Sequence, residues 1–174
     1  MTFVVLQVSD THLSATHAYF TDNWQVFVDE VRALGPDLVI NTGDFSFNGP
    51  AVVEDLAFSH AEAERLGVPY LAVPGNHDVG YSPAALSAEQ RITPERRQKY
   101  LERVGPDFWK FDYGDWRFIG LNPFLFESGF EAEAEQLAMV VEAMSYSGPI
   151  GVFTHVPFFS DHPNEDDPDT TATV

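Results

Sequence analysis

Short apolar runs alternate with helical patterns along the first half of the chain, an alternation that is typical of consecutive βαβ units. Residues 3–8 are apolar or β-branched at nearly every position, which predicts a strand buried on both faces. Apolar residues then recur at helical spacing from Trp24 to Leu34, with Thr21 or Asp22 as the N-cap and Gly35-Pro36 as the stop. The pattern predicts an α/β fold built on a parallel sheet.

The later part of the chain is less regular but carries the same kinds of signal. Its predicted elements are strands at residues 38–40, 70–73, 109–113, 116–121 and 149–154, helices at 51–66 and 93–104, and a last amphipathic helix marked by Leu137, Val140, Val141 and Met144. Gly114-Asp115 indicates a hairpin turn. Residues 161–174 are expected to form an acidic loop or tail, and residues 1–174 together a single domain.

The charge balance of the chain restricts its partners. Lys and Arg number 9 against 27 Asp and Glu, which gives a formal net charge of −18. A field of this sign repels phosphate backbones and attracts divalent cations, so nucleic acid is not an expected partner. The lack of cysteine excludes thiolate zinc sites, iron–sulfur clusters and cysteine nucleophiles. No apolar run has the length of a membrane span or of a signal-peptide core, so we expect a cytoplasmic protein without a membrane partner.

Four polar clusters each follow directly on a predicted strand. They are Asp10-Thr11-His12, Gly43-Asp44, Gly75-Asn76-His77-Asp78 and His155. Because ligands gather beyond the carboxyl ends of strands in an open parallel sheet, we expect the four clusters to meet in one place. Their carboxylate and amide oxygens and imidazole nitrogens suit manganese, iron or zinc. Each cluster alone is more often a turn than a set of ligands, but the order and placement of all four favour a shared site.

The order of these clusters resembles that of the calcineurin-like metallophosphoesterases. The family pattern runs Asp-x-His, Gly-Asp, Gly-Asn-His-Asp or -Glu, an isolated His and a final Gly-His-x-His, and the first four parts stand here at the four clusters. The resemblance implies a four-layer αββα sandwich of two mixed sheets. Residues 118–122, followed by Gly129 and Gln136-Leu137, look most like the cyclic nucleotide phosphodiesterase branch, in which an aspartate usually stands where this chain has Asn122.

The resemblance also implies a centre of two divalent metal ions, which would be manganese, iron or zinc. Asp10 and His12 would hold the first ion, Asn76 and His155 would hold the second, and Asp44 would bridge both. A bridging carboxylate is reasonable because two neighbouring dications need anionic charge between them. In this family the metal pair lowers the pKa of a bridging water, and the resulting hydroxide attacks phosphorus in line.

Two further residues receive roles from the resemblance. His77 would face the leaving oxygen as a proton donor, and Asp78 would orient the His77 imidazole. The implied activity is hydrolysis of a phosphomonoester or phosphodiester, and a cyclic nucleotide or other small phosphodiester is the preferred substrate.

One part of the family pattern is missing, because no Gly-His-x-His occurs in the 174 residues. Those two histidines complete the metal shells in the family. We therefore expect the chain to lack the last strands of the fold, which would leave a sheet edge bare and favour a homodimer. The alternative is a catalytically weak or silent scaffold that binds a partner protein. A nuclease of the same superfamily is disfavoured by the net charge of −18.

Overall fold

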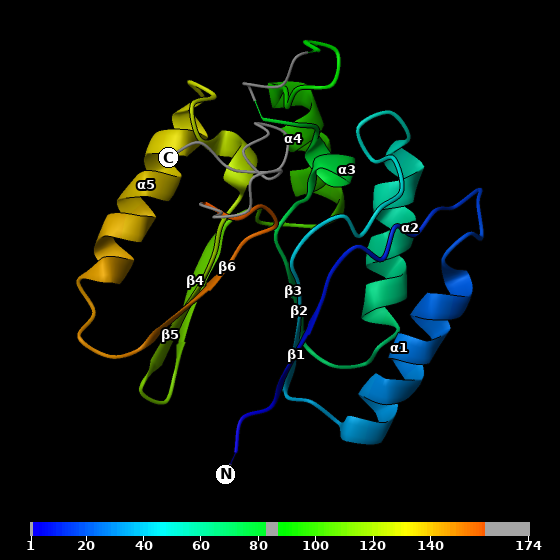
Figure 1. Cartoon of the computed structure of the whole chain (residues 1–174), viewed down its shortest axis with the longest axis horizontal. Coiled ribbons are helices and arrows are strands. Elements are labelled where there is room, and N and C mark those ends of the chain that lie inside the picture. Colours follow the sequence, from blue (N-terminus) through cyan, green and yellow to red (C-terminus); the bar gives the residue numbers. More distant parts are fainter. Residues whose placement is uncertain (1, 83–86, 159–174) are drawn as a thin grey trace, which may run out of the picture.

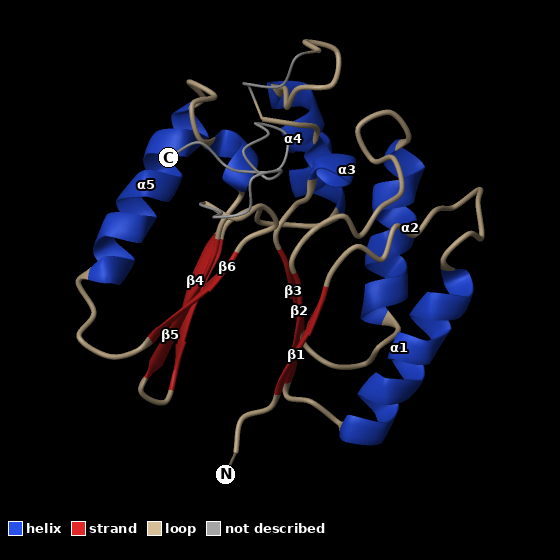
Figure 2. Ribbon diagram, viewed as in Figure 1, coloured by secondary structure: helices blue, strands red, loops and turns tan. Residues whose placement is uncertain are grey.

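A computed structural model describes residues 2–82 and 87–158 of the chain. Within those ranges, two three-stranded sheets lie face to face (Figure 1). Helices α1 (Thr21–Leu34) and α2 (Val53–Glu64) lie outside the first sheet, and α5 (Glu131–Met144) lies outside the second (Figure 2). This arrangement confirms the predicted α/β sandwich with its αββα layers. The predicted acidic tail at 161–174 lies outside the described residues.

The first sheet contains β1 (Val5–Val8), β2 (Leu38–Asn41) and β3 (Tyr70–Ala72), in that order and all parallel. Every residue of the central strand β2 is buried. The prediction that the first strand is buried on both faces is wrong, because β1 lies at the edge of the described sheet and Gln7 is exposed.

The helices that cover the first sheet follow the predicted periodicity more closely than the predicted caps. In α1, Trp24, Val28 and Val31 are buried, and Gly35 ends the helix with a φ of 57°. Its N-cap is Phe20, without a side-chain cap, so Thr21 is already helical and the predicted N-cap is wrong. Helix α2 is shorter than the predicted 51–66.

The second sheet contains β4 (Trp109–Tyr113), β5 (Trp116–Gly120) and β6 (Ile150–Phe153). Strands β4 and β5 form the predicted antiparallel hairpin, and β6 joins β5 in parallel. This sheet is therefore mixed, as expected, whereas the described strands of the first sheet are all parallel.

Helix α5 turns a different face toward the protein than its apolar pattern predicts. Val141 is 73% exposed, and Leu137 and Met144 are also exposed. The buried face carries Gln136, whose side chain accepts a hydrogen bond from the backbone N–H of Asn122 and donates one to the carbonyl of Asn122. These two polar bonds set the rotation of the helix, and they explain why the predicted apolar face is wrong.

The loops that carry the polar clusters are anchored in an apolar core. Phe45, Val79 and Val156 follow the second, third and fourth clusters along the chain, and all three belong to one buried group that also contains Tyr100 and Phe124. Tyr100 lies on α4 (Pro94–Arg103), which begins at the predicted cap Thr93.

Among the residues described, no helix combines the length and apolar character needed to cross a membrane.

Asn122 belongs to a buried polar network that explains why an amide stands at this position. Its side-chain N–H donates to Asp107 over 2.9 Å, and Arg97 holds the same carboxylate through two further bonds of 2.7 and 2.9 Å. Both Asn122 and Asp107 are buried. An aspartate at 122 would place two carboxylates against each other.

We expect Asn122→Asp to lower the free energy of unfolding by about 3–5 kcal/mol, the cost of a buried charge without a partner. Urea unfolding measures the change. The control is Asn23→Asp, which adds the same charge at an exposed position of α1 and should change stability by less than about 0.5 kcal/mol. Equal losses in the two variants would contradict the assigned role of the network.

Candidate metal centre

The four polar clusters meet beyond the carboxyl ends of the strands. The segments after β1 and β2 are joined by backbone hydrogen bonds from Asp10 N–H to the Gly43 carbonyl and from His12 N–H to the Asp44 carbonyl. Leu13 continues this pairing, donating to the Phe45 carbonyl over 2.8 Å. The parallel pairing of β1 and β2 thus extends past the strands and fixes the residues that carry the polar side chains.

Three non-glycine residues of this region have a left-handed backbone. The φ angles are 58° at Asp10, 44° at His12 and 53° at Asp44. Such conformations are unfavourable for L-residues and persist only where the surrounding structure imposes them. Their concentration among the predicted metal ligands points to a functional site.

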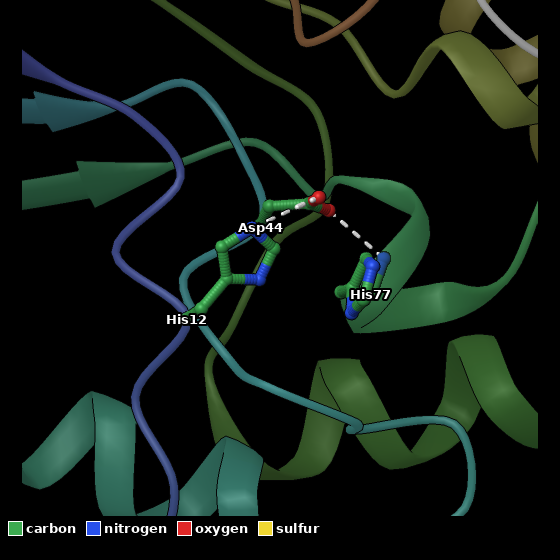
Figure 3. Close-up of side chains that lie close together, drawn as sticks. All are labelled: His12, Asp44 and His77. Carbon is green, nitrogen blue, oxygen red and sulfur yellow. Dashed lines mark hydrogen bonds and ion pairs between the residues drawn. The ribbon is translucent and has the colours of Figure 1, made fainter. Parts of the chain in front are cut away.

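The Asp44 carboxylate lies at the centre of the site, and its side chain is only 6% exposed. Its Oδ2 is 3.7 Å from His12 Nε2, and its Oδ1 accepts a 2.8 Å bond from His77 N–H (Figure 3). The same Oδ1 is 3.5 Å from His155 Nε2. Two groups of three side chains share this carboxylate, and in each group one ligand atom per residue lies within 4.8 Å of the others. The groups are His12, Asp44 and His77, and Asp10, Asp44 and His155.

The spacing and protonation of these side chains fit bound metal ions. The distances of His12 Nε2 to Asp10 (3.9 Å) and to Asp44 (3.7 Å) exceed that of a hydrogen bond, but two ligands of one ion, each bonded at about 2 Å, are separated in this way. His12 Nδ1 is buried and has no hydrogen-bond partner among the described residues. Burial lowers the pKa of His12, which favours the neutral imidazole that binds metal.

Backbone carbonyls orient two of the imidazoles. His155 Nδ1 lies 3.0 Å from the carbonyl of Thr42, and His77 Nδ1 lies 2.6 Å from the carbonyl of Phe47. A carbonyl only accepts, so Nδ1 carries the proton in both rings. Nε2 of His155 is then left for a metal ion, and Nε2 of His77 for a substrate or an ion. Residue types alone do not reveal these carbonyl contacts, so no sequence pattern indicated a role for Thr42 or Phe47.

Asp78 has a different role from the predicted one. Its buried carboxylate accepts hydrogen bonds from Gly75 N–H (2.8 Å), Ser46 N–H (2.9 Å) and Ser46 Oγ (2.7 Å). Burial, reinforced by the charge of Asp44, raises the pKa of Asp78 to about 6. The prediction that Asp78 orients the His77 imidazole is wrong, because Asp78 ties the turn after β3 to the turn after β2 instead.

Glycine is required at two positions around Asp44. Gly43 has a φ of 109°, and a Cβ there would lie 2.6 Å from His155 Nδ1. A Cβ on Gly75 would collide with the Asp44 carboxylate. The two glycines in the predicted motifs therefore serve the close approach of chain segments at the site.

Asn76 is the first residue of the short helix α3 (Asn76–Val79), which no pattern predicted because it is a single turn. Together with His77, Asn76 lines a cleft of 240 Å³ whose wall also includes Tyr81 and Arg96. The expected division of ligands, with Asp10 and His12 on one ion and Asn76 and His155 on the other, stays a prediction. The two close groups place Asp10 with His155 and His12 with His77.

Comparison with known proteins bears on the identity of this site. The family model described as calcineurin-like phosphoesterase matches residues 3–172. A probable cyclic nucleotide phosphodiesterase of Moraxella catarrhalis (strain BBH18) is 34% identical over 130 residues, which are 70% of this chain. The chain spans 44% of the length of that curated relative.

Two solved structures have similar folds. A dimetal phosphatase from Danio rerio superposes with a TM-score of 0.62 at 17% identity, covering 98% of this chain and 74% of its own. The purple acid phosphatase PPD1 from yellow lupin (Lupinus luteus) seeds gives a TM-score of 0.54 at 16% identity, covering 82% of this chain and 27% of its own. These likenesses confirm the fold.

Proposed function

The chain belongs to the calcineurin-like phosphoesterase family, and from this we propose that it is a metal-dependent phosphoester hydrolase acting on a cyclic nucleotide or another small phosphodiester. The observation that carries the proposal is the buried Asp44 carboxylate, which is shared by two groups of metal-binding side chains. The name of the Moraxella relative supports the choice of a diester.

The donor set fits two divalent ions. Asp10, His12, Asn76 and His155 would hold them, and Asp44 would contact both. When bound, such ions lower the pKa of water and neutralise charge on the phosphoryl oxygens. Backbone hydrogen bonds between the segments after β1 and β2 hold Asp10, His12 and Asp44 in their left-handed conformations, which orients these ligands.

His77 is the candidate general acid. The Phe47 carbonyl fixes its ring through Nδ1–H, and when the ring carries a second proton, on Nε2, that proton can pass to a leaving oxygen. The His77 side chain also lines the 240 Å³ cleft, where a substrate group can reach it. The backbone N–H of the same residue bonds to Asp44, which couples the position of the acid to that of the shared carboxylate.

The proposal is tested by adding and removing metal. At about 100 times Kd, Mn²⁺ or Zn²⁺ should stabilise the fold by about 2.7 kcal/mol, raising Tm by about 5–10 °C. Hydrolysis of bis-p-nitrophenyl phosphate should appear with the same ions, and EDTA should reverse both effects. The absence of both effects at millimolar metal would refute the hydrolase and favour the scaffold alternative.

A further inference from the structure

Three aromatic side chains form an exposed cluster beside the metal centre. The rings of His17 and Tyr19 are stacked, with centroids 5.1 Å apart and an interplanar angle of 24°. The ring of Phe47 lies 5.7 Å from each of them. We call these three rings the aromatic platform. Phe47 is tilted by 37° to His17 and by 57° to Tyr19, and Tyr19 is 68% exposed, so the Tyr19 ring is the part of the platform most accessible to a ligand.

The loop that carries His17 and Tyr19 is hydrogen-bonded to a buried carboxylate of α2. Asp55 on α2 is 1% exposed and accepts bonds from Ser14 Oγ (2.8 Å) and Ala15 N–H (2.9 Å). Ser14 Oγ in turn accepts bonds from the N–H groups of Thr16 and His17. The loop is therefore fixed, and binding on the platform needs little further ordering.

The platform is connected directly to His77. The ring of Phe47 lies 6.4 Å from that of His77, and the Phe47 carbonyl binds His77 Nδ1. Only the Phe47 ring therefore lies between Tyr19 and His77, the candidate general acid. In a nucleotide, similarly, only the sugar lies between the base and the phosphate.

We propose that the aromatic platform binds a planar aromatic group of the substrate, such as a nucleobase, on the side of the phosphate that His77 serves. This inference rests on the proposed phosphoesterase function and adds the residues that select the organic group. A base stacked on an aromatic side chain gains about 1–3 kcal/mol, whatever its identity. The platform therefore predicts a preference for nucleosidyl over simple alkyl phosphoesters, without a strong choice among bases.

Adenosine 5′-monophosphate and ribose 5-phosphate test the proposal, because they share sugar and phosphate and differ by the base. Each is measured as an inhibitor of bis-p-nitrophenyl phosphate hydrolysis with Mn²⁺. The inhibition constant of the nucleotide should be at least about fivefold lower in the unmodified protein. Tyr19→Ala should bring the two constants within about twofold, and Tyr19→Phe should keep the difference. The ratio of the two inhibition constants is independent of any change in the affinity for the assay substrate.

The matched control is Tyr113→Ala, which removes another exposed tyrosine, one that stacks on Phe3 at the far end of the second sheet. It should leave the ratio unchanged. Equal inhibition by both compounds in the unmodified protein, or an unchanged ratio of inhibition constants in Tyr19→Ala, would overturn the proposal that the platform binds the base.

Absence of all hydrolysis would instead refute the proposed function. In that case saturation transfer from the Zn²⁺-loaded protein to the adenine protons still decides the question. Transfer that is lost in Tyr19→Ala and retained in Tyr113→Ala supports the platform, and equal transfer in both variants overturns it.

Discussion

Asp44→Asn is expected to abolish both the rise in Tm caused by Mn²⁺ or Zn²⁺ and the hydrolysis of bis-p-nitrophenyl phosphate. The amide keeps the size of the side chain but removes the negative charge that both groups of candidate ligands share. Two neighbouring dications would then repel each other without a shared anion between them. Differential scanning fluorimetry with and without metal measures the loss of the shift of about 5–10 °C.

A second substitution separates this effect from a general loss of negative charge. Asp29→Asn removes one carboxylate from the exposed side of α1, where Asp29 forms an ion pair with Arg32. It should retain the metal-induced shift and the hydrolysis. A full shift in Asp44→Asn would show that the ions bind away from Asp44.

His77→Ala should keep the metal-induced rise in Tm and lower kcat by about 10²–10⁴-fold, the usual contribution of a positioned acid. The Phe47 carbonyl holds the imidazole in a fixed orientation, and no other residue described at the site has a ring held in this way beside the cleft. Steady-state kinetics and thermal shifts on one preparation give both quantities.

The same variant distinguishes two roles for this imidazole. Because His77 lies within reach of His12 and Asp44 in one candidate group, a metal ligand at this position would lose the thermal shift along with turnover. Unchanged turnover would remove His77 from the mechanism altogether. The control is His60→Ala, a part-buried histidine of α2 outside the site, which should affect neither quantity.

The sequence predicted the residues that meet at the site better than the contacts they make. Asp10 and Asp44 could be placed together because each follows a strand of the first, parallel sheet, whose strand ends converge. His155 follows β6 of the second sheet, so its place beside them depends on how the two sheets pack. The left-handed backbone and the carbonyl partners of the imidazoles depend on the packing of segments distant in sequence. No local pattern reports such packing.

The fold, too, could be predicted from the sequence only in part. Periodicity located α1, which buries Trp24, Val28 and Val31 at helical spacing, and the Gly114-Asp115 turn located the β4–β5 hairpin. It failed for the rotation of α5, where the bonds of Gln136 to the Asn122 backbone prevail over the apolar stripe. It also missed α3, a single turn that the Asp78 carboxylate closes onto Gly75.

The extended pairing between the segments after β1 and β2 has a consequence for ion selectivity. Backbone hydrogen bonds between the two segments fix Asp10, His12 and Asp44, so these candidate ligands cannot move freely toward or away from a bound ion. An ion of unsuitable radius would have unfavourable metal–ligand bond lengths, because the ligands do not rearrange around it. Discrimination between cations should therefore follow ionic size more steeply here than it would in a cage built on loose turns.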